Sequence, residues 1–445
     1  MKSISQPRGR PAAHAHPLGT RGGNSLRTVA EASIIDYLLV NACAYEVGAG
    51  RRDEAVAATM AALARWTDDG LPVALDGVRR YDPVEVLNFM KWSGLHRGDP
   101  FWFERYLPTT RRFVTDQCAD ATSPRRFEGL PPCEFRVIFR RQFNLPPRPV
   151  GTPHRLRLPL PLEDAVLDNL RLQVTTDIDG EVALTRIPGR LEARLNAADR
   201  KAASVTYCAN FRSRADTPST RRLDASRADT LDVGELALYT RPHEGFIRVT
   251  PGIVALASEL ARDKHSRLEI VYAFWDYLID QMMCGPIHYY EIDMSRPLDW
   301  LLEIGWYDCQ LGSALLVGLC RAVNIPARII NGHLLYSLAP GLHYWAEVWL
   351  DDGGWTPFDL LSWDLSGGGQ DRAWRNCFAQ RLDYRMKTQC LPRAFLGPLG
   401  VPMPAQWHLL TSLNREGIRI SIVDATSTEV AYCDDICVEQ KVPKT

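Results

Sequence analysis

A helix that starts with a cysteine constrains this chain more than any other sequence feature. Asp308 is one of the residue types that cap helices, and Cys309 follows it directly. The stretch from Asn324 to Pro326 ends the helical run, so we expect Cys309 to lie in the first helical turn. The partial positive charge and open N–H groups at this end favour a thiolate over a thiol. The sequence therefore predicts a lowered pKa for Cys309, and N–H groups that could hold an oxyanion.

An alternating strand follows this helix and turns back on itself. The strand covers His343–Leu350, an Asp-Gly turn signal stands at 352–353, and a return strand reaches Asp359. A tight turn there would place Asp359 opposite Ala346, on the face away from His343. A longer loop or a bulge is therefore needed if the two side chains are to meet.

The apolar periodicity changes several times along the 445 residues, which are enough for two or three domains. Helical spacing precedes Pro131, and short β-like runs follow it. Helical spacing returns after Pro251. We expect an α+β chain with these segments: a flexible leader at 1–29, a helical module at 30–130, a β-rich domain at 131–239, a core at 240–365, and a C-terminal extension with a β-hairpin at 366–445.

Composition excludes some classes of function. With 46% hydrophobic and 24% charged residues, the chain resembles ordinary globular protein, and its formal charge of −1 gives no field for nucleic acid or an anionic membrane. It has no phosphate-cradling Gly-rich loop, no basic stripe and no apolar run of about 18 residues. Eleven cysteines without a C-x-x-C pair fit a reducing compartment. We expect a cytoplasmic protein with no nucleic-acid or membrane partner, and the oligomeric state stays open.

Three segments resemble the core of the transglutaminase-like superfamily. They are Asp308-Cys309 with the helix that follows, His343 to Val348, and Gly354 to Asp359, in that chain order. The resemblance implies a papain-like core in which Cys309 is the nucleophile, His343 transfers the proton and Asp359 orients the histidine. The β-rich stretch before the core resembles the amino-terminal domain of some bacterial members. The expected architecture is a papain-like transglutaminase core preceded by a helical module and a β-rich domain.

Two positions depart from the family pattern near the expected site. Tyr307 stands where a glycine often precedes the Asp-Cys pair, and Leu360 replaces the proline that commonly follows the aspartate. Neither change removes a reactive atom, but both can alter the mouth of the site. The candidate substrate contacts are Trp306, Tyr307, His333 and Trp345.

Other interpretations of the same residues remain open. Cys309 could be a buried structural cysteine, His333 is a rival base, and Asp364 is an alternative acid within reach. Arg328 and Glu347 could form a structural ion pair instead of a substrate contact. We expect no metal ion or cofactor, because no second ligand pair lies near Cys433 and Cys437 and no calcium-loop pattern occurs.

The resemblance implies a cysteine-nucleophile hydrolase or acyltransferase. Such an enzyme forms an acyl-enzyme at Cys309 from an amide or thioester and passes the acyl group to water or to an amine. An amidase, a peptidase and an acyltransferase differ only in the substrate and this acceptor. A peptide, a protein or a carrier-bound acyl group is the expected substrate. The alternative is a non-catalytic module that binds protein or peptide on the same scaffold.

Overall fold

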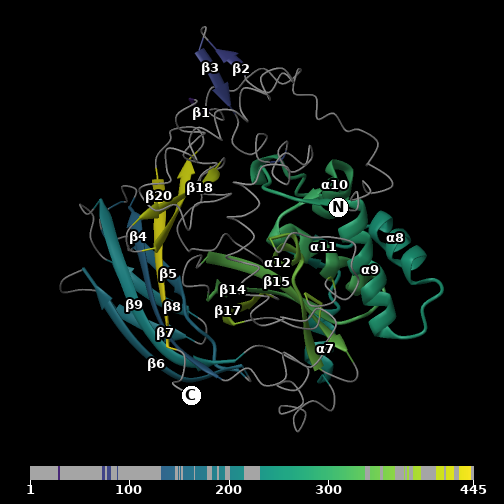
Figure 1. Cartoon of the computed structure of the whole chain (residues 1–445), viewed down its shortest axis with the longest axis horizontal. Helices are drawn as coiled ribbons and strands as arrows, with labels where there is room; N and C mark the ends of the chain where they lie inside the picture. Colours follow the sequence, from purple (N-terminus) through teal and green to yellow (C-terminus); the bar gives the residue numbers. More distant parts are fainter. Residues whose placement is uncertain are drawn as a thin grey trace, which may run out of the picture.

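Two parts of the molecule lie side by side, a large curved sheet and a core of helices around a smaller sheet (Figure 1). Helices and antiparallel sheets occur together, as the predicted α+β class requires. The computed structural model describes residues 29–30, 73–75, 78–81, 88, 132–145, 149, 151, 154–164, 166–177, 183–187, 190–195, 201–214, 231–335, 341–350, 354–365, 375, 378–379, 384–391, 407–414, 417–424 and 430–441.

The core sheet has four antiparallel strands in the order β16-β15-β14-β17. One face, which includes Ala327, Ala346 and Val348, joins the apolar core beneath the helices. β17 follows the core in sequence, in the segment predicted as a C-terminal extension, yet it forms an edge of this sheet. The four strands are β14 (Ala327–Leu334), β15 (Gly341–Leu350), β16 (Gly354–Phe358) and β17 (Arg385–Leu391).

Helix α11 (Cys309–Ala322) is the central helix of the core and packs directly on this sheet. Asp308 caps its first turn, because Oδ1 accepts a hydrogen bond of 2.8 Å from the backbone N–H of Leu311. Asn324 adopts a left-handed conformation with φ of 59° just after the helix, which ends the helical run. Twelve of its fourteen residues are buried, so packing on all sides fixes the position of Cys309.

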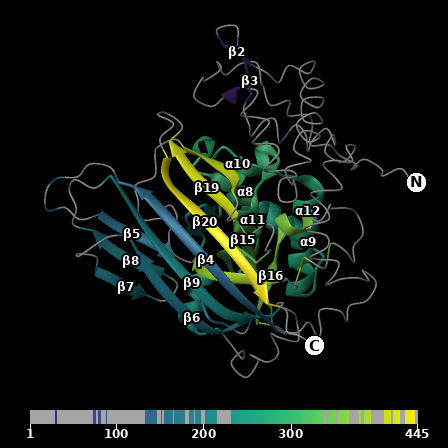
Figure 2. The same ribbon diagram turned by 60° about the vertical axis from the view of Figure 1, so that its left-hand side comes forward.

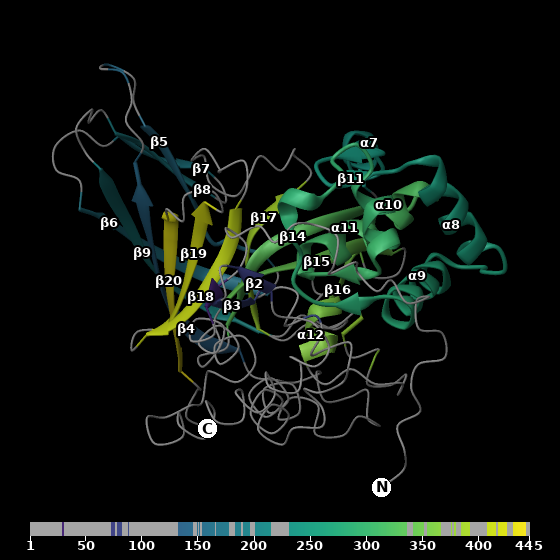
Figure 3. The ribbon, with the colours of Figure 1, turned by 90° about the horizontal axis from the view of Figure 1, so that it is seen from above.

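The remaining helices cover the side of the core that lies away from the large sheet (Figure 3). Local signals define their ends: Ser266 and Glu269 form a reciprocal capping box that starts α9. The other core elements are α7 (Val233–Tyr239), α8 (Pro251–Ala261), α9 (Arg267–Gln281), α10 (Pro297–Ile304), α12 (Leu360–Leu365), the 3-10 helix η4 (Tyr289–Glu291), the pair β10 (His243–Glu244) and β11 (Ile247–Arg248), and the pair β12 (Met283–Cys284) and β13 (Trp306–Tyr307).

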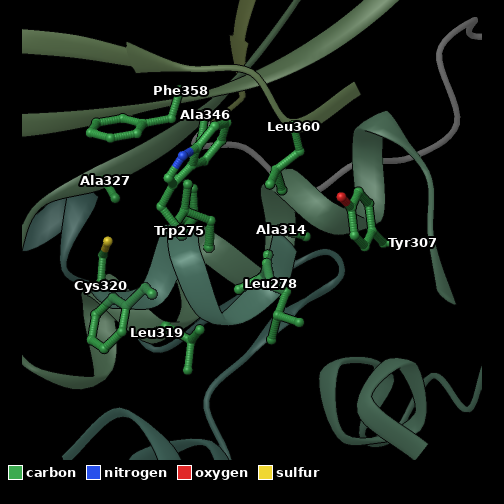
Figure 4. Close-up of a cluster of buried hydrophobic side chains, with 14 of the residues drawn as sticks. Trp275, Leu278, Tyr307, Ala314, Leu319, Cys320, Ala327, Ala346, Phe358 and Leu360 are labelled. Atoms are coloured by element: carbon green, nitrogen blue, oxygen red, sulfur yellow. The ribbon is translucent and has the colours of Figure 1, made fainter. Parts of the chain in front are cut away.

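Apolar side chains from the helices and the sheet meet in one cluster (Figure 4). Trp275 of α9 packs edge-on against Phe358 of β16, with ring centroids 5.9 Å apart. Ala314 and Leu319 of α11 belong to the same cluster and are fully buried. Burial of each large apolar side chain contributes about 1.5–3 kcal/mol. The end of β16 therefore has a fixed position against α9.

The large sheet has six strands in the order β18-β19-β20-β4-β9-β6 (Figure 2). β4 alternates buried and exposed residues, so one face of the sheet is covered and the other faces solvent. β20 comes late in the sequence but pairs with nearly the whole of β4, from Glu134 to Phe143. The six strands are β4 (Cys133–Asn144), β6 (Leu167–Thr176), β9 (Ala202–Ser213), β18 (Trp407–Asn414), β19 (Gly417–Asp424) and β20 (Val430–Lys441).

A second apolar cluster lies between the large sheet and a three-stranded sheet in the order β5-β8-β7. Its strands are β5 (His154–Pro159), β7 (Ala183–Ile187) and β8 (Arg190–Leu195). The core joins this cluster directly, because Leu335, Tyr384 and Met386 belong to it. The backbone N–H of Leu162 also donates a hydrogen bond of 2.8 Å to the carbonyl of Lys387 in β17. The large sheet and the core therefore share an apolar junction.

Nearly all of the predicted leader and helical module lies outside the described residues. The described parts include β1 (Val29–Ala30), β2 (Val73–Leu75) and β3 (Val78–Tyr81), which form a small sheet in the order β1-β3-β2. The helical character of the module and the predicted domain boundaries stay predictions.

His333 makes this junction sensitive to acid. Its ring is fully buried, packs edge-on against Phe139 of β4 at 5.6 Å, and has no hydrogen-bond partner at either nitrogen. Burial, with a contribution from the Arg141 guanidinium, lowers the pKa of His333 to about 3. The unfolded chain binds this proton below pH about 6.5, whereas the folded chain does not, so stability falls as the pH drops through this window.

We expect this histidine to remove about 2 kcal/mol from the free energy of unfolding between pH 7 and pH 5. Urea unfolding at both pH values, on wild type and His333→Leu, measures the effect. The variant lacks the titrating ring, so its loss between the two pH values should be smaller than that of wild type by about 2 kcal/mol. Equal losses in the two proteins would contradict the prediction.

Candidate active site

Cys309 is the first residue of α11 and lies beside strand β15. Its side chain is partly exposed, and backbone N–H groups of Tyr344 and Gln310 donate hydrogen bonds to Sγ. Tyr344 can do so because the pairing of β15 with β16 ends at Ala346 and Phe358. The structure thus brings the cysteine to the residue that follows His343.

The pKa of the Cys309 thiol differs from the sequence prediction. Burial raises it well above its ordinary value, and the Asp308 carboxylate adds to the rise, while the two N–H hydrogen bonds oppose it. The helix terminus was expected to lower this pKa, but its charge is balanced locally by Asp308. The N–H group of Leu311 donates to that same carboxylate, so it does not offer an open oxyanion site. The raised pKa favours the thiol form of this cysteine.

His343 and Asp359 form a hydrogen bond of 2.7 Å between Nε2 and Oδ2, and both side chains are fully buried. The hairpin register explains how they meet. Leu350 pairs with Gly354, which leaves three residues between the strands instead of the two of a tight turn. Continuing this register places Asp359 opposite Trp345, on the same face as His343. The loop is therefore longer than a tight turn, as the sequence analysis required for His343 and Asp359 to meet.

The Asp359 carboxylate accepts hydrogen bonds at both oxygens. Ser362 donates from its backbone N–H to Oδ1 at 2.9 Å and from its hydroxyl to Oδ2 at 2.8 Å. Arg385 of β17 donates from Nη2 to Oδ2 at 2.9 Å. Burial alone would raise the pKa of Asp359, but the His343 imidazole, Arg385 and these hydrogen bonds outweigh it and hold the pKa well below its usual range. Asp359 is therefore ionised.

The ionised carboxylate fixes the tautomer of His343. A carboxylate can only accept, so the ring must carry its proton on Nε2. Nδ1 is then the nitrogen with a lone pair, and it is buried without a hydrogen-bond partner. Both ring nitrogens are accounted for, so the alternative acid Asp364 makes no hydrogen bond to the ring. His333 lacks any such orienting carboxylate, because neither of its ring nitrogens has a partner.

Tyr289 is a site residue that sequence reasoning missed. Its hydroxyl lies 2.6 Å from Asp308 Oδ2 and 3.1 Å from the side-chain oxygen of Gln310, at the start of α11. Burial and the nearby Asp308 carboxylate raise the pKa of Tyr289 well above its usual value, so it is a neutral donor. No motif marks this tyrosine, since it comes from η4 in a loop with no regular periodicity.

The predicted substrate contacts lie in different environments. Trp306 is partly exposed in β13, whereas Tyr307 is fully buried against Gly312 of α11. Trp345 is fully buried and stacks on the His343 ring, with centroids 5.9 Å apart. His333 lies at the junction with the large sheet. A role in substrate binding stays a prediction for all four.

Arg328 and Glu347 form the ion pair that the sequence offered as an alternative to a substrate contact. Arg328 donates to Glu347 Oε2 at 2.7 Å and 3.0 Å, and Lys387 lies 2.7 Å from Oε1. Burial opposes ionisation of Glu347, yet the two cations lower its pKa to about 2.

Cys433 lies in β20 of the large sheet. Among the described residues, no three His, Cys, Asp or Glu side chains gather as metal ligands.

The sequence model of the transglutaminase-like superfamily matches residues 254–360. The match contains Cys309, His343 and Asp359. This segment belongs to the transglutaminase-like superfamily. The family resemblance of the three motifs is confirmed, and the papain-like core of the predicted fold follows from it.

Several solved structures are similar to the chain. A candidate cysteine protease from Cytophaga hutchinsonii is 15% identical with a TM-score of 0.45, covering 71% of this chain and 92% of its own. The periplasmic domain of TgpA from Pseudomonas aeruginosa is 16% identical with a TM-score of 0.29, covering 52% and 91%. A candidate protease from Parabacteroides distasonis is 10% identical with a TM-score of 0.23, covering 68% and 70%. Likenesses this distant carry no inference about the chemistry of this chain.

No curated protein matches the chain. Among the described helices, none combines the length and the apolar character needed to cross a membrane.

Gly332 leaves room for the Trp345 indole on the strand next to His343. It pairs with His343 across β14 and β15, and a Cβ there would collide with the carbonyl oxygen of Met386 and lie 2.7 Å from Trp345 Cη2. We expect Gly332→Ala to lower the free energy of unfolding by about 1–3 kcal/mol, because backbone and a buried indole must move. Urea unfolding measures this loss.

Gly318→Ala is a matched control for that substitution. Its Cβ would meet only the flexible end of the Leu298 side chain, and alanine favours the α11 backbone by up to about 1 kcal/mol. An equal or larger loss of unfolding free energy in Gly318→Ala would contradict the prediction. It would show that contact with the Trp345 indole and the β17 backbone is not what disfavours a side chain at residue 332.

Proposed function

We propose that this protein is a thiol enzyme that forms an acyl-enzyme at Cys309 from an amide or a thioester. One observation carries the proposal: His343 is hydrogen-bonded to an ionised Asp359 through Nε2, and its Nδ1 is buried without a partner. Cys309 Sγ meanwhile lies against the backbone N–H of the next residue, Tyr344. No hydrogen bond joins Nδ1 to Sγ in this structure, and catalytic hydrogen bonds are often long before substrate binds. A base with an oriented lone pair, in the residue next to the one that contacts the cysteine, fits thiol catalysis.

The first half of the reaction transfers one proton and forms one bond. As Sγ attacks the carbonyl carbon, the thiol proton passes to Nδ1 of His343, and the carbonyl oxygen takes the negative charge. Asp359 stabilises the imidazolium that forms and holds the ring in place. Collapse of this intermediate breaks the bond to the amine or thiol leaving group. The leaving group takes the proton from Nδ1, and a thioester with Cys309 remains.

The second half returns the enzyme to its starting state. Water or an amine gives a proton to Nδ1 and attacks the thioester carbonyl. The acyl–sulfur bond breaks, and the proton returns to the sulfur. Water as acceptor makes the protein an amidase or a peptidase, and an amine makes it an acyltransferase. A peptide, a protein or a carrier-bound acyl group is the proposed substrate, and a bacterial, cytoplasmic setting stays a prediction.

A non-catalytic binding module is the second candidate, and one observation favours it. His343 and Asp359 are fully buried, and the Trp345 indole covers the imidazole. A site closed in this way could serve a scaffold that has lost its chemistry. Against it, burial of an ionised carboxylate and an unpartnered ring nitrogen is unfavourable unless the pair has a use.

Alkylation of the cysteines by iodoacetamide, followed by intact-protein mass and peptide mapping, tests the enzyme. We expect one adduct at Cys309, formed faster than at any other cysteine at pH 7, because His343 removes the thiol proton. Cys309→Ser should abolish this adduct. His343→Ala should slow it by about 10²–10⁴-fold, the usual contribution of general base catalysis.

Cys208 gives an internal control within the same spectra. It is partly exposed on the large sheet, next to Asn210, so its labelling should be the same in wild type and in His343→Ala. Labelling that is slow, spread over several cysteines and unchanged in His343→Ala would contradict the proposed enzyme. The non-catalytic binding module would then be the better explanation.

A further inference from the structure

Arg385 is a buried cation in the proposed site, and it comes from outside the segment that matches the family. It belongs to β17, is 4% exposed, and places Nη2 2.9 Å from Asp359 Oδ2 and 2.8 Å from the Ser362 hydroxyl. The family match ends at residue 360, whereas β17 begins at Arg385. No step of the proposed reaction uses this side chain.

Arg385 and His343 act on the same carboxylate oxygen. Oδ2 of Asp359 accepts from Nε2 of His343 at 2.7 Å and from Nη2 of Arg385 at 2.9 Å. Guanidinium is always charged at ordinary pH, so Arg385 already balances the carboxylate in the resting protein. A second positive charge on the imidazole would lie close to the first in a buried environment, where charges are poorly screened. The resting pair of Asp359 and Arg385 therefore favours an uncharged ring.

Other charged groups around His343 do not replace this effect. Asp308 and Cys309 come from α11, and Asp308 is held by Tyr289 and by the N–H groups of the helix. Glu347, on the same strand, is compensated by Arg328 and Lys387. His333 of β14 is buried and uncharged at neutral pH, with its pKa lowered to about 3 by burial and by Arg141 of β4. Asp364 of α12 makes no hydrogen bond to the ring.

We propose that Arg385 is a positioning residue that keeps His343 uncharged at rest, by compensating Asp359, so that Nδ1 can accept the proton of Cys309. This inference rests on the proposed function. Arg385 also disfavours the imidazolium that forms during attack, so the ring gives up its proton readily to the leaving group. Without Arg385, the buried Asp359 carboxylate would favour a second proton on the His343 ring. Nδ1 would then stay protonated, and unable to accept the proton of Cys309, up to a higher pH.

The pH dependence of Cys309 alkylation separates this role from simple packing. Initial rates with iodoacetamide, a neutral reagent, are measured from pH 5.5 to 9, and the rate of His343→Ala at each pH is subtracted. Arg385→Gln keeps a hydrogen-bond donor but removes the charge, and Arg385→Lys keeps the charge. We expect the midpoint of the acid limb of the rate profile to rise by about one pH unit or more in Arg385→Gln. Its rate at pH 6 should then be about tenfold lower than that of wild type. The midpoint of Arg385→Lys should return toward that of wild type.

Arg328→Gln is the matched control. It removes a partly buried arginine from the adjacent strand β14 and leaves Glu347 paired with Lys387, so its midpoint should equal that of wild type. Circular dichroism at each pH confirms that every variant is folded. If Arg385→Gln leaves the midpoint unchanged or lowers it, or if both Arg385 variants lose rate equally at all pH values, the proposal is overturned.

Nitrogen-15 chemical shifts of His343 in wild type give a test that needs no Arg385 variant to fold. At pH 7 we expect a neutral ring protonated at Nε2, with Nδ1 unprotonated; a charged imidazolium at that pH overturns the proposal. Failure of the proposed function looks different. In that case wild-type Cys309 is not labelled faster than Cys208, and His343→Ala has no effect, whatever the result for Arg385.

Discussion

The burial of α11 against β14 and β15 is the contact on which the rest of the site depends. A helix with twelve buried residues of fourteen cannot shift without opening the core, so Cys309 and the strand that bears His343 have a fixed relation. The same packing explains why the pKa of the cysteine is raised. The apolar surroundings that hold the helix also limit the access of water to the partly exposed Cys309, and this desolvation outweighs the attraction of the helix terminus. Position and reactivity thus have one physical origin.

The local elements of the site could be predicted, because their signals are local. Asp308 caps α11 and Asn324 ends it, as their residue types suggest. The alternation from His343 to Leu350 gives β15, which begins two residues earlier in the structure. The return strand could also be predicted, but its register could not. A single residue in the loop decides whether Asp359 faces His343. The residue types of the turn indicate that a turn is present, but they do not determine how many residues the loop contains.

Non-local partners account for most of what the sequence did not reveal. Arg385 comes 26 residues after Asp359. The residues on either side of it in the sequence match none of the three motifs. Tyr289 comes from an irregular segment before the cysteine. The C-terminal hairpin was predicted, yet its insertion beside β4 depends on tertiary pairing that no periodicity encodes.

The pairing of β20 with β4 has a consequence for the order in which the molecule forms during synthesis. Arg141 and Asp434 are 293 residues apart in sequence, and they meet in a buried bidentate ion pair at 2.6 Å. β4 leaves the ribosome long before β20 exists, so one of its edges is unpaired while the whole core is being made. Exposed strand edges promote association between chains. The nascent protein must therefore protect this edge until β20 has been made.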